Sequence, residues 1–332
     1  MKNACIGLLF VLLFHAGVWG HSVNVLIAKH VPRVNLSFSQ NYAIVIGKNF
    51  YGPISSQNQL RLTSGADGIR LTVRNAQTKV HKNLGASKGP IFLVRSLGPG
   101  INFNWPKPLS SLKKQPLPPF LKWQQFPSQK GAFVSFRHPS YGDTITYNGP
   151  LTLFAKKGIN IVETAELENY VTHVVNCELG SESSLHALKA QSVIVRTFAL
   201  YMVQNRLESR QQGNPNWKFF QLLASPADQA YNCRKRANDQ ELPSDLVKKA
   251  ARETAGLVLL KKNALAKVQY NTGSAKNLPK GVISQDDIIR KAHAGQTYTA
   301  ILRAAVPGSK VGRYNPSALC TQALKTLFQQ KK

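Results

Sequence analysis

The sequence has few carboxylates: 15 Asp and Glu stand against 43 Lys and Arg, and the formal net charge is +28. A field of this strength indicates an anionic partner or surface, and a merely solubilising basic surface is the weaker interpretation. Charge alone does not choose among a wall polymer, an anionic envelope lipid and extracellular nucleic acid. The chain also lacks internal repeats and low-complexity tracts, which argues against a repeat architecture.

Long apolar runs are missing after the N-terminus, so no later segment is predicted to span a membrane. At the N-terminus a lysine precedes the apolar run 6–14, and Val18 and Gly20 occupy the −3 and −1 positions of a small-residue cleavage site. This pattern is typical of a secretory signal peptide over residues 1–20. The mature chain is expected to be exported to the periplasm or cell envelope.

Cysteine is scarce, with four residues in the chain. Cys5 precedes the apolar run of the signal and is not a lipid-anchor site. Export permits a disulfide, but Cys177, Cys233 and Cys320 allow one bridge and one free thiol, and spacing does not identify the pair. His173 and Cys177 are four residues apart, yet two ligands do not close a metal site. Neither a metal nor a cofactor is therefore predicted.

Helical periodicity is absent from the first 150 residues. Segments 22–46, 59–95 and 133–163 are rich in strand-forming residues, and Asn148-Gly149 is a short turn signal. The proline-rich segment 98–127 is predicted to be a long loop. Its aromatic residues either stack on sugar rings or pack on the domain surface, and packing is the commoner role.

Carboxylates gather in one window of twenty residues, which holds five of the 15 acids: Glu163, Glu166, Glu168, Glu178 and Glu182. The same window begins two helical patterns. In the first, Thr164 is the predicted N-cap, Gly180 ends the helix, and an apolar face recurs at spacings of three and four. The second helix is predicted to start at Ser183 or Ser184, and its apolar residues on most faces predict burial on most sides.

Glu178 lies at the end of the first predicted helix, where a carboxylate opposes the helix dipole. Lys189 and Arg196 share one face of the second helix, and buried cations need partners. Glu178 is therefore either an active-site carboxyl or a surface glutamate paired with one of these cations. Spacing alone favours the ion pair.

The segment ELENYVTHVVNCELGSESSLHALKAQSVIVRTFAL resembles the signature of the SpoIID/LytB family, the stage II sporulation protein D and amidase-enhancer group. That signature reads E-x-Y-V-x-x-V-V-x-x-E-M and then E-A-L-K-A-Q-A-V-A-A-R-T-Y. The positions in register are Glu168, Tyr170, Val171, Val174, Val175, Glu178, Ala187, Leu188, Lys189, Ala190, Gln191, Arg196 and Thr197. The resemblance covers residues 147–308 well and residues 23–46 weakly.

The resemblance implies a secreted lytic transglycosylase that cuts peptidoglycan glycan strands and leaves 1,6-anhydro-muramyl products. It implies that Glu178 is the single acid and base, and that the substrate-binding residues are Lys189, Arg196, Gln191, Gln229 and Tyr231. A cation close to the acid would keep it ionised, so Lys189 and Arg196 are expected not to form a salt bridge with Glu178. Asp228 is either a second carboxylate or, more simply, the cap of a turn.

The chain departs from the family pattern at Cys177, usually Ser, and at His186, usually Glu. It also lacks the G-H-G part of the motif that precedes Gly281-Val-Ile-Ser-Gln285. These departures motivate an alternative, a non-catalytic peptidoglycan-binding module that stimulates a separate amidase. A third hypothesis, a nucleic-acid-binding protein, rests on charge alone, because no nucleic-acid module is recognisable.

The predicted fold class is α+β, with a β-rich N-terminal half, a helical catalytic core with a β-hairpin, and a cleft between them. A β-rich region over residues 21–146 follows the signal peptide. The SpoIID/LytB-like domain spans residues 147–308, and a C-terminal helix lies within residues 309–332. The expected partners are peptidoglycan strands and an amidase, with no specific nucleic acid.

Overall fold

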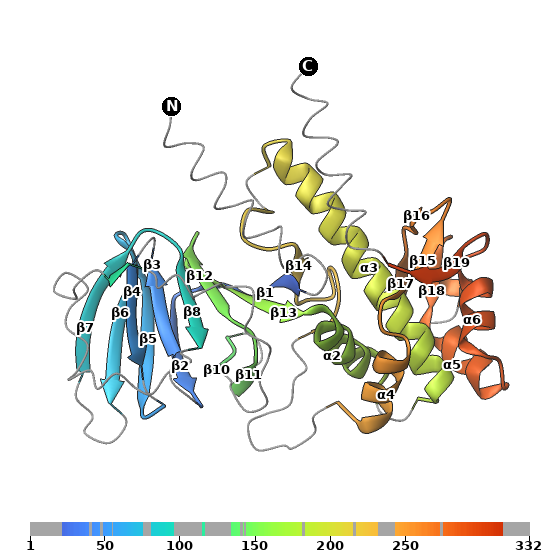
Figure 1. The fold of residues 1–332 in the computed structure, drawn as a ribbon, viewed down its shortest axis with the longest axis horizontal. Helices are drawn as coiled ribbons and strands as arrows, with labels where there is room; N and C mark the ends of the chain where they lie inside the picture. Colours follow the sequence, from blue (N-terminus) through green and yellow to red (C-terminus); the bar gives the residue numbers. More distant parts are fainter. Residues whose placement is uncertain are drawn as a thin grey trace. The chain divides into compact units, whose positions relative to one another are not determined.

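The computed structural model has the predicted α+β fold (Figure 1). It describes residues 22–39, 42–46, 49–54, 56–75, 81–95, 115–116, 134–139, 142, 144–180, 183–214, 217–231, 243–272 and 275–314. The chain divides into two compact units. The β unit comprises residues 24–165 with 234–240, and the helical unit comprises residues 1–23, 166–233 and 241–332.

Two sheets make up the β unit. The first has the order β1 (Ser22–Val31), β13 (Ile159–Glu166), β12 (Leu151–Ala155), β8 (Ile91–Arg95), β3 (Tyr42–Ile46), β4 (Asn49–Ile54) and β9 (Gln115–Pro116). The second has the order β11 (Thr144–Tyr147), β10 (Val134–Arg137), β2 (Arg33–Phe38), β5 (Asn58–Gly65), β6 (Gly68–Asn75) and β7 (His81–Ser87). Every strand pair of this second sheet is antiparallel.

The chain passes between the two sheets several times, and two of these crossings are at Pro32 and at residues 148–150. The predicted turn at Asn148-Gly149 therefore joins strands of different sheets and does not close a hairpin. Glu163, which is fully buried, accepts hydrogen bonds from the backbone N–H groups of Asn148 (3.2 Å) and Gly149 (3.0 Å). A Cβ at Gly149 would lie 2.2 Å from the carbonyl oxygen of Thr164, so only glycine fits this crossing.

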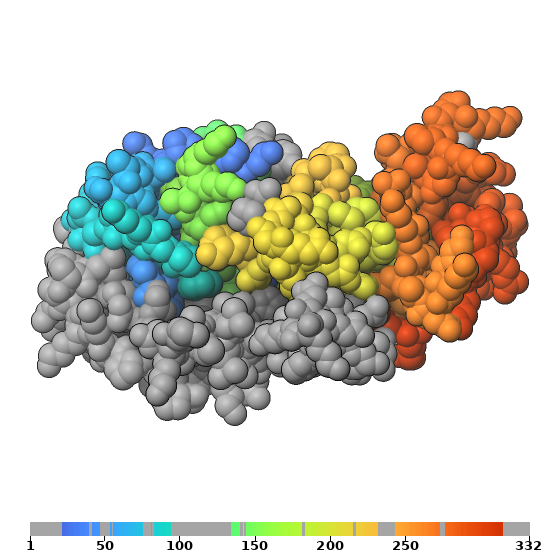
Figure 2. All heavy atoms as spheres, turned by 90° about the horizontal axis from the view of Figure 1, so that it is seen from above, coloured from blue at the N-terminus to red at the C-terminus, as the bar shows by residue number. Residues whose placement is uncertain are grey.

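The helical unit is built around α3 (Leu185–Gln211), which contacts α2 (Leu167–Leu179), α4 (Asp245–Glu253), α5 (Gln285–His293) and α6 (Tyr298–Ala305). Its strands are β14 (Leu222–Leu223), the sheet β16 (Ala264–Leu265), β15 (Leu257–Lys261), β19 (Lys310–Arg313), and the parallel pair β17 (Gln269–Asn271) and β18 (Val282–Ser284). A short 3₁₀ helix, η2, spans Ala275–Asn277. In Figure 1, the first half of α3 lies among the later segments of the unit, and Figure 2 shows these later segments in orange and red. Burial of α3 on most sides, as predicted, makes it the axis of this unit.

Several helix ends agree with the sequence. Ser184 caps α3 by accepting a hydrogen bond from the N–H of Ala187, and Gly180 ends α2 with φ 71°. The predicted Thr164 cap is wrong. Thr164 belongs to β13, where its hydroxyl donates to Asn24 Oδ1 at 2.7 Å, and α2 begins after Glu166 without a side-chain cap. Strand pairing has therefore extended β13 up to the first turn of the helix.

Some predictions fall outside the described residues, namely the signal peptide, most of the proline-rich segment and the helix after residue 314. The boundary between the units falls at residue 165, whereas the sequence placed the start of the domain at residue 147, because β12 and β13 are strands of the β unit. Within the described ranges, no helix is both long and apolar enough to cross a membrane.

Candidate functional site

Glu178 lies in the last turn of α2, and both of its carboxylate oxygens accept hydrogen bonds from neutral donors. Oε1 accepts from the Tyr270 hydroxyl at 2.9 Å and from the Ala230 N–H at 3.3 Å. Oε2 accepts from the side-chain amides of Gln191 at 3.0 Å and Gln285 at 3.5 Å. In the described part of the chain, no Lys or Arg forms an ion pair with this carboxylate.

The direction of the Tyr270 hydrogen bond is fixed by the residues behind it. The buried amide of Gln229 donates to the Tyr270 oxygen at 2.9 Å and to the Val195 carbonyl at 3.3 Å, while its oxygen accepts from the Tyr170 hydroxyl at 2.8 Å. Because its amide already faces two acceptors, Gln229 leaves Tyr270 as the donor to Glu178. Gln229 thus acts on Glu178 through Tyr270.

Gln191 is a buried residue of α3, and it contacts the carboxylate oxygen of Glu178 that Tyr270 does not contact. Its side chain is 0% exposed, and its amide nitrogen donates to Glu178 Oε2. Its amide oxygen is buried without a hydrogen-bond partner among the described residues. An unsatisfied acceptor next to a carboxyl is costly in a protein interior, so this oxygen is available to a proton or hydroxyl that enters the site.

Burial raises the pKa of Glu178 from 4.5 to about 7, and the hydrogen bonds from Tyr270, Ala230, Gln191 and Gln285 limit the rise. Desolvation disfavours the charged form, and each donated hydrogen bond favours it. The pKa of Tyr270 is raised well above its usual value by burial and by the adjacent Glu178. A carboxyl with this pKa exchanges a proton near neutral pH, which is the property a general acid needs.

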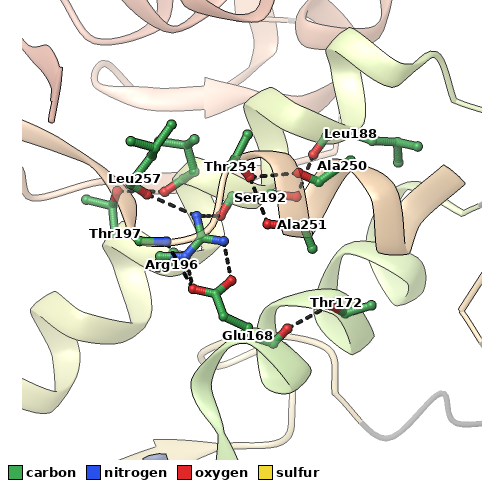
Figure 3. A network of polar contacts seen from close by, with 12 residues as sticks. Glu168, Thr172, Leu188, Ser192, Arg196, Thr197, Ala250, Ala251, Thr254 and Leu257 are labelled. Atoms are coloured by element: carbon green, nitrogen blue, oxygen red, sulfur yellow. Dashed lines mark hydrogen bonds and ion pairs between the residues drawn. The ribbon is translucent and has the colours of Figure 1, made fainter. Parts of the chain in front are cut away.

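Arg196 does not reach Glu178 and instead joins three elements of the unit (Figure 3). Its guanidinium donates to Glu168 Oε1 at 2.9 Å and Oε2 at 2.6 Å, and to the Leu257 carbonyl at 3.0 Å. Glu168 also accepts from the Gly256 N–H at 3.2 Å. Arg196 is 0% exposed, so the predicted substrate contact does not fit this geometry, and a role in positioning α2 against α3 does.

Of two further predicted binding residues, Lys189 keeps some exposed surface and Tyr231 is fully buried. Lys189 Nζ lies 2.5 Å from Glu253 Oε2, and its side chain is 15% exposed. This ammonium lowers the pKa of Glu253 by its hydrogen bond. Tyr231 is fully buried with its ring 4.9 Å from the ring of Tyr170, so it supports the hydrogen-bonded tyrosine and offers no surface to a ligand.

Asp228 is held as a structural residue of its loop. Its carboxylate forms a two-pronged ion pair with Arg206, whose Nη2 lies 2.8 Å from Oδ1, and it accepts from the Leu223 N–H at 2.8 Å. Its side chain is 2% exposed. The sequence offered a second carboxylate or the cap of a turn, and the Asp228 carboxylate instead pairs with Arg206 and the Leu223 N–H within its own loop.

The pair of His173 and Cys177 does not offer two metal ligands. Cys177 is disulfide-bonded, so its sulfur is not available as a thiolate, and His173 Nδ1 lies 2.7 Å from the Asn169 carbonyl oxygen. The other three cysteines lie outside the described residues. Of the pairings left open by the sequence, a bridge that leaves Cys177 free is excluded.

Glu178, Gln191 and Gln229 are brought together as a cluster, whereas sequence reasoning missed Tyr270 and Gln285. Gln285 is the last residue of the Gly281-Val-Ile-Ser-Gln285 motif, whereas Tyr270 lies in β17 and belongs to no motif named from the sequence. Their convergence on Glu178 depends on segments about 100 residues away, which a local pattern does not reveal.

These features define a partly buried carboxyl that accepts hydrogen bonds from phenol and amide donors on four segments of the chain. Residues 155–260 match the family model SpoIID, described as stage II sporulation protein, so this part of the chain is similar to that family. This match indicates a role related to the cell wall, and the SpoIID family is linked to peptidoglycan lytic activity. No curated protein matches the chain.

Proposed function

We propose that the protein is an exported lytic transglycosylase that cleaves the glycan strands of peptidoglycan, with Glu178 as its acid and base. The observation that carries this proposal is the environment of Glu178. It is a partly buried carboxyl with a pKa of about 7, it has four neutral donors, and no Lys or Arg among the described residues is paired with it. The match of residues 155–260 to the SpoIID family, which is linked to peptidoglycan lytic activity, supports the proposed class of substrate.

Most glycosidases use two carboxylates, but an intramolecular cleavage proceeds with one. The protonated Glu178 gives its proton to the glycosidic oxygen, and the bond from that oxygen to the muramyl anomeric carbon breaks. The C6 hydroxyl of the same muramyl residue then attacks the anomeric carbon, and the Glu178 carboxylate takes the hydroxyl proton. The products are a 1,6-anhydro-muramyl end and a free hydroxyl on the departing sugar, and no water is consumed.

The hydrogen bonds favour Oε2 of Glu178 as the oxygen that carries the proton in this proposal. Oε1 accepts hydrogen bonds from the Tyr270 hydroxyl and the Ala230 N–H. The donors to Oε2 are the side-chain amides of Gln191 and Gln285, which can rotate. When Oε2 carries the proton, half a turn of the Gln191 amide directs its buried oxygen toward that proton. Gln191 therefore holds the carboxyl in both protonation states, which fits a group that acts first as acid and then as base.

The other predicted binding residues take different roles in this proposal. Lys189 retains exposed surface beside Glu253 and is suited to contact the acidic groups of the substrate. Arg196, Gln229 and Tyr231 are buried and act as positioning residues. Arg196 fixes the start of α2 through Glu168, and Gln229 fixes the Tyr270 hydroxyl.

The test is mass spectrometry of the products formed from purified peptidoglycan, with and without stem peptides, by the wild type and by Glu178→Gln. Anhydro-muramyl ends from the wild type alone are expected. Reducing ends would identify a hydrolase and would contradict the single-carboxyl mechanism. Binding to sacculi without any cleavage would favour the module that stimulates an amidase.

A further inference from the structure

Arginines are concentrated in one sheet of the β unit. The chain between residues 24 and 165 contains six arginines, and five lie in the second sheet: Arg33 in β2, Arg61 in β5, Arg70 and Arg74 in β6, and Arg137 in β10. The sixth, Arg95, lies in β8 of the first sheet. The family model begins at residue 155, after all six of these arginines, so it assigns them no role.

The register of the strands places the five arginines on the same face of the sheet. Residues directly opposite one another on antiparallel strands point to the same side. Arg33 is opposite Thr63, and Thr63 is opposite Arg70. Arg33 and Arg70 are therefore two strand spacings apart, about 10 Å, and Arg61 lies diagonally beside both arginines of β6, at about 7–8 Å.

We define the arginine face as residues 33, 35, 37, 59, 61, 63, 70, 72, 74, 135 and 137, which lie on β2, β5, β6 and β10 (Figure 1). The alternating positions on the other side are buried at 0–5% exposure and belong to the core: Val34, Leu36, Phe38, Leu60, Leu62, Leu71, Val73, Val134 and Phe136. Arg33, Arg70 and Arg137 are exposed, and Arg61 and Arg74 are half-buried. The face is thus fixed by the core behind it and directed away from that core.

The positive charge of this face is not neutralised by the described part of the chain. Residues 24–165 contain three acids. Asp67 lies in the turn between β5 and β6, Glu163 is buried in the first sheet, and Asp143 is outside the described residues. None of the five arginines forms an ion pair with a described Asp or Glu.

Two of the arginines are oriented by bonds that leave the ends of their side chains open. Arg61 donates through Nε to Asn35 Oδ1 at 3.1 Å, and Arg137 donates through Nε to the Gly142 carbonyl at 2.7 Å. These contacts use one nitrogen of each guanidinium and keep the two terminal nitrogens as donors. An arginine that is held in this way loses less conformational entropy when it binds an anion, and its fork matches phosphate oxygens.

The residues between the arginines indicate the kind of anion. They are Ser, Thr, Asn and Gln, and the face contains no Phe, Tyr, Trp or aliphatic residue. A membrane surface would be met by apolar side chains, and single-stranded nucleic acid by aromatic rings for its bases. Small hydroxyls and amides instead suit a chain of alternating phosphates and hydroxyls. We propose that the arginine face binds a flexible polyol-phosphate polymer.

The test measures binding of the full chain to synthetic poly(glycerol phosphate) over a series of salt concentrations. The variant Arg61→Gln/Arg70→Gln/Arg74→Gln removes three charges from the face. The matched control Arg252→Gln/Arg303→Gln/Arg313→Gln removes three exposed arginines from the helical unit. We expect the face variant to bind at least tenfold more weakly, with a shallower salt dependence, and the control to change by less than about threefold.

Equal losses in the two variants, or none in the face variant, would overturn the proposal. Tighter binding of duplex DNA or of anionic lipid vesicles, lost in the same face variant, would overturn the class of partner. If the triple variant fails to fold, the single exposed variants Arg33→Gln and Arg70→Gln provide the same comparison against Arg252→Gln. The result does not depend on the reaction at Glu178, because binding is measured without cleavage.

Discussion

The amide nitrogen of Gln191 lies 3.0 Å from Glu178 Oε2, and the amide oxygen of the same side chain is buried without a partner in the described part of the chain. Gln191 is fully buried in α3, so its amide has few positions available apart from half a turn about its last bond. One orientation serves the ionised carboxyl and the other serves the protonated one. The orientation of the Gln191 amide therefore depends on whether Glu178 is protonated.

Replacing Gln191 by Leu is expected to raise the pKa of Glu178 above 7. The hydrogen bond from Gln191 lowers this pKa, and a bond to the charged form is worth more than one to the neutral form. The measurement is the pH at which cleavage declines on the alkaline side, or a carboxyl titration by NMR. Gln204→Leu, on the same helix, removes a hydrogen bond to Glu208 and is the control. An unchanged pKa would show that Gln191 only fills space.

Replacing Tyr270 by Phe removes the 2.9 Å donor to Glu178 Oε1 and keeps the ring. The pKa of Glu178 is expected to rise, because that hydrogen bond also lowers it. The value of kcat should fall by roughly tenfold or more, since the carboxyl loses its fixed orientation. Tyr298→Phe in α6 is the matched control and should leave the pH profile unchanged. A rise in KM with kcat unchanged would instead assign Tyr270 to substrate binding.

Glu178→Gln is expected to stabilise the protein at alkaline pH. The folded-state pKa is raised from 4.5 to about 7, so the folded wild type holds the proton more tightly than the unfolded chain. Its free energy of unfolding therefore falls as pH rises through this interval, and the variant avoids this loss. The difference should be near zero below pH 4.5 and approach about 3 kcal/mol above pH 7. Urea unfolding at pH 4 and pH 8 measures it, and a difference independent of pH would contradict the raised pKa.

Arg196→Lys is expected to destabilise the helical unit by about 2–4 kcal/mol. A lysine cannot reproduce the two bonds to Glu168 together with the bond to the Leu257 carbonyl. Arg252→Lys, at an exposed position of α4, should change stability by less than about 0.5 kcal/mol. Denaturant unfolding measures both variants. A stable Arg196→Lys variant with impaired substrate binding would restore the direct contact that the sequence predicted.

Local features of the helical unit could be predicted from the sequence because each depends on residues close together in the chain. The N-cap Ser184 and the stop at Gly180 need only their neighbouring residues. Spacing could not predict the partner of Arg196. Both Glu168 and Glu178 lie on α2, and only the packing of α2 on α3 brings Glu168 to the guanidinium.

In the candidate site, Glu178 and Gln191 could be predicted from the sequence, but Tyr270 and Gln285 could not. Glu178 and Gln191 belong to one continuous signature, so their association follows from two adjacent helices. Tyr270 and Gln285 are 92 and 107 residues beyond Glu178. Their approach results from the packing of β17 and α5 in this unit, which no local period encodes. The arginine face was likewise hidden, because its residues unite only when the register of four strands is known.

The central claim is that Glu178 cleaves the glycan strand without consuming water. In the most direct test, purified peptidoglycan is digested by the wild type and by Glu178→Gln in water enriched in oxygen-18. Mass spectrometry then gives the masses of the new muramyl ends. We predict anhydro ends that are one water lighter than reducing ends, carry no oxygen-18 and form only with the wild type. Reducing ends that carry the label, or unchanged cleavage by Glu178→Gln, would contradict the account.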